Sequence, residues 1–305
     1  ASDKSIGKKV NFKNKDYSLV GLNDFDFSKV QIAFFSAGSA IAEKWVPIAA
    51  KKTIVIDNSK HFRMDKDIPL IVPEVNPESL AQYKNKNIIA NANCSTIQLV
   101  LALKPLHDQF KIKRVVTSTY QSVSGGGKNH MIELEEQTKS VLEKKKVKSK
   151  NFTKQIAFNV IPQCDHFLEN NFTKEEMKLV WETHKILDPN IQVQPTCVRV
   201  PVFNGHSEAV FFKVSKEMSR EEIIEILENS PGIKVLDDPD KGVYPTPVEN
   251  ASDTEDVYVG RIRSQKLDDE SWISMWIVAD NVYGKGAALN AVHICEELLS
   301  LNLAK

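Results

Sequence analysis

The sequence predicts an α/β protein in which a parallel sheet is followed by a mainly antiparallel one. In the N-terminal third, short apolar strands alternate with helical stretches and small residues follow the strands, as in parallel sheets that are covered by helices. In the remainder, strands rich in β-branched residues come in pairs, which is typical of antiparallel sheets. The length of 305 residues is enough for one large or two ordinary domains.

In the first part, a polar opening leads to two short strands. A buried strand, a helix and a second apolar strand come next. A short strand, a short helix and another strand then lead into a long amphipathic helix. These elements are expected at residues 10–12, 17–21, 29–35, 40–51, 53–57, 68–73, 77–83, 87–90 and from 94 to about 110.

The second part begins with a strand and a helix, and a helix capped by Thr173 follows. Two pairs of strands come next, each expected to be antiparallel, with a helix between the pairs. The last helix is expected to return to the first part. These elements are expected at residues 113–119, 131–146, 173–187, 192–200 with 207–214, 220–228, 257–263 with 272–280, and up to about 301.

The composition is that of an ordinary globular chain and excludes several classes of function. Forty basic residues balance forty acidic ones, so no basic excess indicates nucleic acid. No apolar run approaches the ~18 residues that span a membrane, and the N-terminus is polar. The four cysteines are widely spaced without a CxxC pair, which argues against a zinc ribbon or a disulfide framework. A cytoplasmic location and no metal site are therefore expected.

The central stretch of the chain is Asn91-Ala92-Asn93-Cys94-Ser95-Thr96, between a strand and an amphipathic helix. This places Cys94 at or beside a helix N-terminus, with Ser95 and Thr96 as capping hydroxyls. Unpaired N–H groups and the helix dipole there would lower the pKa of the thiol and raise its nucleophilicity. The alternative is a small buried residue that starts a helix.

Two further groups of residues have the chemistry to accompany a cysteine nucleophile. Gln121 follows a strand and precedes a Gly-rich turn at 125–128, which is not a P-loop but lets the backbone approach a ligand. Arg199 and His206 lie seven residues apart on a strand and the loop after it. They can anchor a carboxylate and serve as general acid/base, or be an unrelated surface pair.

Charged residues elsewhere allow similar alternatives. Glu175 and Lys178 share a helix face, either at a site or as a surface ion pair. Arg63 lies in a loop after a parallel strand, where such sheets bind ligands, and is an anion-contact candidate. The basic tract at 144–150 is expected to be a solvated helix end.

In order and spacing, these motifs resemble the aspartate-semialdehyde dehydrogenase family, and the similarity runs nearly end to end. The matching stretches include Asp57-Asn58-Ser59, Phe62-Arg63-Met64-Asp65, Asn93-Cys94-Ser95-Thr96, Ser122-Val123-Ser124-Gly125, Glu175-Glu176-Met177-Lys178, Arg199-Val200-Pro201-Val202, His206-Ser207-Glu208 and Lys285-Gly286-Ala287-Ala288.

The resemblance implies an enzyme that reduces aspartyl 4-phosphate with NADPH to aspartate 4-semialdehyde and phosphate. The pathways implied are the biosynthesis of lysine through diaminopimelate, of threonine and of methionine. Cys94 would be the nucleophile that forms a thioacyl enzyme, His206 the acid/base and Gln121 the residue that orients the intermediate. The resemblance assigns the substrate's carboxylate and amino group to Arg199 and Glu175, and its phosphate to Arg63, Asn93 and Lys178.

For the cofactor NADP, the resemblance implies contacts from several small and polar residues. They are Ser36, Ala37, Gly38, Ser124, Gly125, Gly126 and Asn281, with Ser2, Lys4 and Ser5 in the loop that reads the adenosine 2′-phosphate. The family usually has Arg where this chain has Lys4, which supplies a cation without the planar fork.

The fold implied is a Rossmann-type NADP-binding domain at 1–93 plus 286–305 and a catalytic and dimerisation domain at 94–285, associated as a homodimer. The first domain is expected to be incomplete. Relative to the family, the chain begins after a strand, a Gly-rich turn and a helix, roughly 30 residues. Two other interpretations stay open: an enzyme like N-acetylglutamyl-phosphate reductase, and a truncated, catalytically silent subunit that only dimerises.

Overall fold

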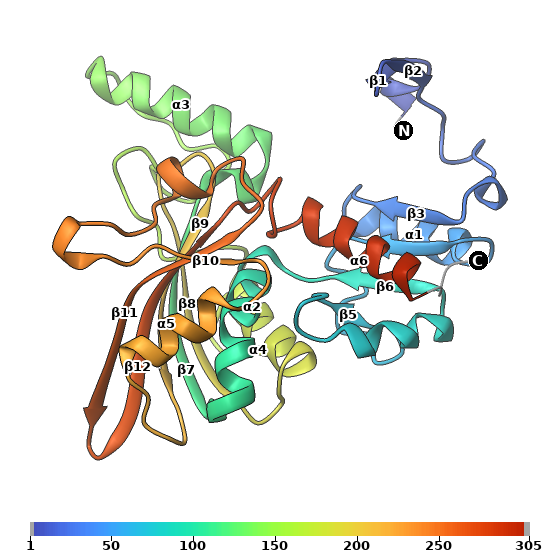
Figure 1. Cartoon of the computed structure of the whole chain (residues 1–305). Helices are drawn as coiled ribbons and strands as arrows, with labels where there is room; N and C mark the ends of the chain where they lie inside the picture. The colour runs from blue at the N-terminus through green and yellow to red at the C-terminus, as the bar shows by residue number, and fades with distance from the viewer. Residues whose placement is uncertain (1–2, 302–305) are drawn as a thin grey trace.

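The computed structural model describes residues 3–301, which form two main sheets with helices packed on their faces (Figure 1). A four-stranded parallel sheet has the order β3-β4-β6-β5, and a six-stranded mixed sheet has the order β10-β11-β12-β9-β7-β8. Three of the five strand pairs in the larger sheet are antiparallel. The predicted fold class, a parallel α/β part followed by a mainly antiparallel α/β part, is confirmed.

The helices and strands follow the predicted order closely. The first part contains β1 (Lys9–Phe12), β2 (Lys15–Ser18), β3 (Ile32–Phe35), α1 (Ser39–Ala49), β4 (Ile54–Asp57), β5 (Leu70–Ile71), the 3-10 helix η3 (Pro77–Asn85), β6 (Ile88–Asn91) and α2 (Cys94–Phe110). The second contains β7 (Arg114–Gln121), α3 (Lys128–Leu142), α4 (Lys174–Ile186), β8 (Gln192–Arg199), β9 (His206–Lys213), α5 (Arg220–Glu228), β10 (Ile233–Val235), β11 (Val257–Leu267), β12 (Glu270–Ala279) and α6 (Ala288–Ser300).

In the parallel sheet, β4 and β6 are central and β3 lies at an edge. The strand at 29–35, which was expected to be buried, is therefore only partly buried, and Phe34 is 52% exposed. Its ring lines an apolar groove between this edge and residues 18–30. The predicted return of the last helix is confirmed, because the Asn290 side chain on α6 donates to Ile71 O at 3.0 Å.

The larger sheet differs from the prediction in how its strands pair. The strands β8 and β9 run in opposite directions but are not neighbours, because β7 lies between them, parallel to β8 and antiparallel to β9. The expected pairing of 192–200 with 207–214 is thus wrong. The pairing of β11 with β12 is as predicted, and β10, which was not predicted, joins β11 in parallel.

The helix α2 connects the two sheets and starts directly after β6. Its N-cap is Asn93, whose side-chain oxygen accepts from Ser95 N at 3.1 Å and Thr96 N at 3.3 Å. The expectation that Ser95 and Thr96 are the capping hydroxyls is wrong, because both residues already lie inside the first turn. Cys94 is the first helical residue.

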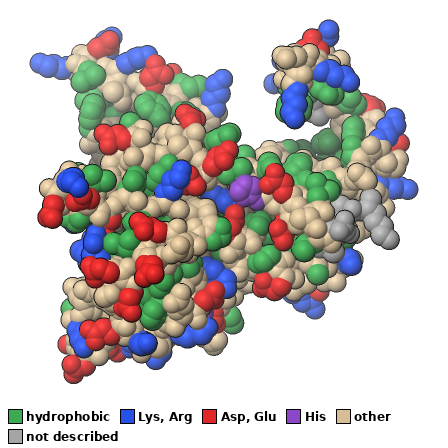
Figure 2. Space-filling view, in the orientation of Figure 1, with side chains coloured by type: hydrophobic (Ala, Val, Ile, Leu, Met, Phe, Trp, Pro, Cys, Tyr) green, Lys and Arg blue, Asp and Glu red, His purple; other side chains and the backbone are tan. Residues whose placement is uncertain are grey.

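Apart from the two main sheets, β1 and β2 form a two-stranded antiparallel hairpin. The hairpin of β1 and β2 projects from the body as an arm, and all eight of its strand residues are exposed. Charges of both signs are interspersed over the face in Figure 2. Within residues 3–301, no helix has the length and apolarity needed to cross a bilayer, and no His, Cys, Asp and Glu cluster has the make-up of a metal site.

Candidate active site

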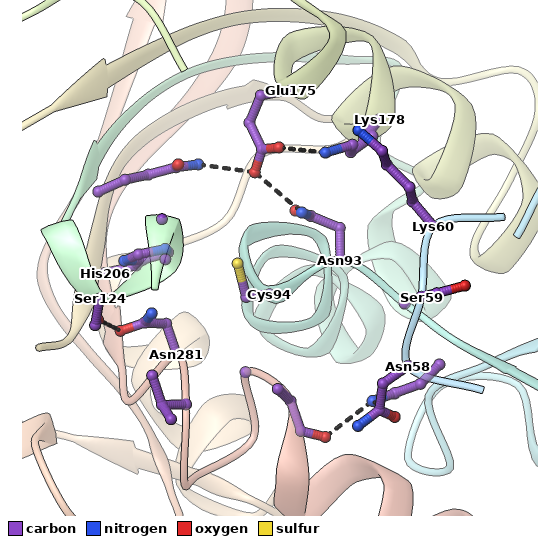
Figure 3. Close-up of a pocket in the computed structure, with 18 of the residues that line it drawn as sticks. Asn58, Ser59, Lys60, Asn93, Cys94, Ser124, Glu175, Lys178, His206 and Asn281 are labelled. Atoms are coloured by element: carbon purple, nitrogen blue, oxygen red, sulfur yellow. Dashed lines mark hydrogen bonds and ion pairs between the residues drawn. The ribbon is translucent and has the colours of Figure 1, made fainter. Parts of the chain in front are cut away.

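A cavity of about 760 Å³ opens where the carboxyl ends of β4 and β6 meet the start of α2 and the larger sheet. Parallel sheets place ligands at this edge. The structure brings together in its walls most of the residues singled out from the sequence, namely Ser36, Gly38, Arg63, Asn93, Cys94, Gln121, Ser124, Gly125, Gly126, Glu175, Lys178, Arg199, His206 and Asn281 (Figure 3).

Cys94 is half-buried in the cavity wall at the N-terminus of α2. Burial, with a smaller effect of the Glu175 carboxylate, raises the pKa of its thiol to about 11, and three nearby cations oppose this only in part. The lowered pKa expected from the helix N-terminus is therefore wrong for the ligand-free site. Cys94 rests as a neutral thiol and needs help to lose its proton.

His206, at the start of β9, is fully buried and neutral. Burial and the neighbouring Arg199 guanidinium lower the pKa of its imidazole to about 3. Its Nδ1 accepts the backbone N–H of Ser122 at 3.1 Å, so the neutral ring carries its proton on Nε2. Nε2 is buried without a partner among the described residues, beside Gly125. An unpaired buried donor of this kind is suited to a ligand oxygen.

Glu175, in the first turn of α4, is the centre of a buried polar network (Figure 3). Its Oε1 accepts from Asn93 Nδ2 at 3.0 Å and Gln121 Nε2 at 3.3 Å, and its Oε2 accepts from Lys178 Nζ at 2.6 Å. Although burial would raise it, Lys178 and Asn93 hold the pKa of the Glu175 carboxyl near 2. The pair is not a surface ion pair, since both side chains are at most 12% exposed.

Arg63 and Arg199 place two guanidinium groups on the cavity wall. Arg63 donates through Nε to Asn91 O at 2.9 Å and through Nη1 to Glu182 at 3.1 Å. Its Nη2 donates to Asn58 O at 3.1 Å, which leaves one N–H on each terminal nitrogen for a ligand. Arg199 donates through Nη1 to a backbone carbonyl at 2.6 Å.

The remaining wall is built from small residues and one amide. Asn281 accepts from Ser124 Oγ at 3.0 Å, while its Nδ2 is a buried donor with no partner in the described part of the chain. A side chain at Gly125 would come within 3.1 Å of the His206 ring. Gly38 has φ +83° and precedes α1 without a capping side chain, so the first N–H groups of that helix stay open.

A few predicted contacts lie elsewhere. Ala37 is next to the cavity wall but lines the apolar groove beside β3. Lys4 and Ser5 belong to a short 3-10 turn that begins the projecting arm and are not part of the wall. Ser2 lies outside the described residues.

Sequence reasoning missed several residues of this cavity. Lys60, Asn58 and Ser59, all in the loop after β4, line it, and so do Asp165 and His130. The loop position after a parallel strand was a usable signal for the first three. No local signal marks Asp165, which lies in the irregular segment that precedes α4.

Comparison with known proteins accounts for both halves of the chain. Residues 1–83 match the family model "Semialdehyde dehydrogenase, NAD binding domain", and residues 103–283 match "Semialdehyde dehydrogenase, dimerisation domain". An aspartate-semialdehyde dehydrogenase of Shewanella sp. (strain DB6705) is 50% identical over 301 residues, covering 98% of this chain and 88% of the relative. The chain belongs to the aspartate-semialdehyde dehydrogenase family.

Further members of the family agree with this placement. The enzyme of Aquifex aeolicus (strain VF5) is 50% identical over 307 residues, covering 99% of this chain and 89% of that protein. The crystal structure of aspartate semialdehyde dehydrogenase II from Vibrio cholerae complexed with ASA matches with a TM-score of 0.94 at 49% identity, covering 98% and 88%. The chain is thus an oxidoreductase with aspartate-semialdehyde dehydrogenase activity, a small-molecule substrate and a nicotinamide cofactor, and the dimerisation domain supports a homodimer.

Proposed function

We propose that the chain catalyses the NADP-dependent reductive dephosphorylation of aspartyl 4-phosphate to aspartate 4-semialdehyde through a thioacyl intermediate on Cys94. The observation that carries the proposal is the arrangement of charge around the thiol. The buried Glu175 carboxylate lines one cavity with Cys94 and with cations that include Arg63, Lys178 and Arg199. Aspartyl phosphate carries an ammonium group, a carboxylate and a phosphate, which are the complementary charges.

In the first step, Cys94 Sγ bonds to the acyl carbon, the C–O bond to phosphate breaks, and the thiol proton leaves with the phosphate. The phosphate would be held by Arg63, Asn93 and Lys178. In its resting tautomer His206 acts as a donor, because Nε2–H can hydrogen-bond to the acyl oxygen as it becomes anionic. To act as a base, His206 must move its proton to Nδ1, which displaces the Ser122 N–H contact.

The other end of the substrate would be held by Glu175 and Arg199. Glu175 stays ionised and already accepts from the Lys178 ammonium, so a substrate ammonium suits it equally well. Gln121 donates both to this carboxylate and to Ser95 Oγ at 2.8 Å, which fixes its amide beside the first turn of α2. Gln121 is therefore placed to orient the acyl group against Cys94.

The small-residue wall fits a nicotinamide dinucleotide. The unpaired Nδ2 of Asn281 is a donor for a carboxamide oxygen, and the open N-terminus of α1 at Gly38 suits a pyrophosphate. Ser36, Ala37, Ser124, Gly125 and Gly126 complete the contacts that we propose. When bound, the cofactor supplies the hydride that reduces the thioester. The Candida albicans enzyme, solved with NADP, has a TM-score of 0.74 at 26% identity and supports the choice of NADP. Ser2, Lys4 and Ser5 are proposed to read the 2′-phosphate.

The proposal is tested in the reverse direction with aspartate semialdehyde, phosphate and NADP, by following the absorbance of the reduced cofactor. We expect turnover that depends on phosphate and disappears in Cys94→Ala, and a preference for NADP over NAD. Turnover without phosphate, or retained in the Cys94 variant, would overturn the thioacyl mechanism. A folded protein that binds cofactor but shows no turnover would favour the silent subunit.

N-Acetylglutamate semialdehyde tests the alternative that the chain is an enzyme like N-acetylglutamyl-phosphate reductase. An acetylated amine has no charge to replace the Lys178 ammonium at Glu175 when Lys178 turns to the phosphate, and a buried carboxylate that loses its cation costs a few kcal/mol. We therefore expect the aspartate compound to be preferred. A preference for the acetylated substrate would contradict the proposed role of Glu175.

The assembly and cellular setting are also proposals. A homodimer would form through the face of the larger sheet opposite α2, where Val116 pairs with Phe211 and the Tyr120 ring lies 5.3 Å from Trp276. We propose domain boundaries at 1–93 plus 286–305 and 94–285, since the parallel sheet with α6 falls in the first set and the larger sheet in the second. Four free thiols support a reducing, cytoplasmic location, where the product would enter lysine, threonine and methionine biosynthesis.

A further inference from the structure

A lysine outside the predicted site lies at the edge of the cavity. Lys60 is in the loop that follows β4, and its side chain lies next to Lys178 in Figure 3. Its Nζ is 3.2 Å from Asp165 Oδ2, and its side chain is 40% exposed. A flexible, partly exposed lysine can exchange one anionic partner for another at little cost.

The partner of Lys60 is shared with a second cation. The same Asp165 oxygen is 3.2 Å from Lys178 Nζ, which also pairs with Glu175. Although burial would raise it, Lys178, the His166 N–H and Lys60 hold the pKa of the Asp165 carboxyl well below its ordinary value. Asp165 therefore stays ionised and holds both ammonium groups at one side of the cavity.

Arg63, the anion-binding candidate, lies three residues beyond Lys60 on the same loop. Its guanidinium is held by Glu182 and two backbone carbonyls, so it cannot follow a ligand. Lys60 has no partner other than Asp165 among the described residues and is free to turn. One rigid guanidinium and two ammonium groups around one volume form a site for a tetrahedral dianion.

We infer that Lys60 is a further phosphate-binding residue, which pairs with Asp165 in the ligand-free enzyme and turns to the phosphate group when it binds. The inference rests on the proposed function, because it assumes that phosphate occupies the Arg63 and Lys178 side of the cavity. Asp165 acts as the counter-ion that holds the partly exposed Lys60 within reach of the ligand.

The test compares Lys60→Met with Lys66→Met. Lys66 is exposed on the same loop, away from the cavity, so its replacement removes the same charge without touching the site. In the phosphate-dependent reaction we expect Lys60→Met to raise the KM for phosphate about fivefold, as for the loss of one partly exposed ion pair. The KM for aspartate semialdehyde should change by less than about twofold in both variants.

A second readout needs neither cofactor nor turnover. Inorganic phosphate should slow the alkylation of Cys94 by iodoacetamide, and the half-protecting phosphate concentration should also rise about fivefold in Lys60→Met. An equal rise in the KM for phosphate in both lysine variants would mean that Lys60 acts only by long-range attraction, and it would overturn the inference. An unchanged KM for phosphate in both variants would overturn it as well. A wild-type enzyme that turns over without phosphate would instead refute the proposed function, so the two failures are distinct.

Discussion

Replacing Glu182 by glutamine removes a buried carboxylate that holds two parts of the active site together. The Glu182 side chain is 1% exposed; Oε1 accepts from Arg63 Nη1 at 3.1 Å and Oε2 accepts from the backbone N–H of Asn93 at 2.6 Å. Glutamine has the same shape but one oxygen. Its amide NH₂ would face either the guanidinium or the backbone N–H, both of which are donors.

The expected loss of stability depends on the hydrogen bonds that Arg63 keeps in Glu182→Gln. Removing one partner of a buried ion pair costs about 3–5 kcal/mol. Because Arg63 retains hydrogen bonds to the carbonyls of Asn91 and Asn58, we expect the lower limit, about 3 kcal/mol. In a chain of this size that lowers the melting temperature by about 5 °C or more. A displaced Arg63 should also raise the KM for phosphate about tenfold.

The measurements are a thermal melt and phosphate kinetics, with Asp108→Asn as the matched control. Asp108 pairs with Lys104 at 2.7 Å on the surface of α2, where a lost ion pair costs about 0.5 kcal/mol. A Glu182→Gln enzyme that melts with the control would refute the claim that the carboxylate stabilises the buried pair. Lower stability with an unchanged phosphate KM would refute its role in positioning Arg63.

Four further predictions follow from the same structure. The alkylation rate of Cys94 in the ligand-free enzyme should keep rising to above pH 10, since its pKa is about 11; a plateau near pH 8 would contradict this. His206→Gln, which keeps a donor near Nε2, should retain at least about tenfold more kcat than His206→Asn, because one such donor is worth about 10²–10³; equal loss would rule out the donor role. Burial raises the pKa of Glu208 to about 8, so the stability that protonated Glu208 contributes is complete below its unfolded pKa and is lost as the pH rises to 8. The melting temperature should therefore fall over this pH range. Glu208→Gln, which still pairs with Gln98, should flatten the fall, and an unchanged slope would contradict the raised pKa. Phe211→Glu on the outer sheet face should convert a dimer to a monomer in light scattering, and an intact dimer would place the interface elsewhere.

The order of the elements could be predicted because it depends on local patterns. Alternation, apolar periodicity and capping residues are properties of neighbouring residues, and α5 falls at Arg220–Glu228 as predicted. Strand pairing is not local. The insertion of β7 between β8 and β9 depends on which apolar faces meet in the folded chain, and nothing within 192–214 records it.

The same distinction applies to the site. That Cys94 begins a helix is readable from the sequence, but its pKa depends on burial and on Glu175, eighty-one residues later in the chain. The spacing of Glu175 and Lys178 is as common on a surface as in a site. Only the contacts from Asn93 and Gln121 distinguish the two.

The charges around the cavity have a consequence for which ligand fits. Three of its cations already pair with carboxylates: Arg63 with Glu182, and Lys60 and Lys178 with Asp165 and Glu175. No carboxylate pairs with Arg199 within residues 3–301. A ligand with a single anionic group could satisfy Arg199 alone and leave the other pairs as they are. An amino acid with a carboxylate and a phosphate satisfies Arg199 and also competes for the two lysines. Its ammonium group then replaces Lys178 as the partner of Glu175. Under the proposed function, the ion pairs of the empty site thus favour an amino acid with both a carboxylate and a phosphate over simpler anions.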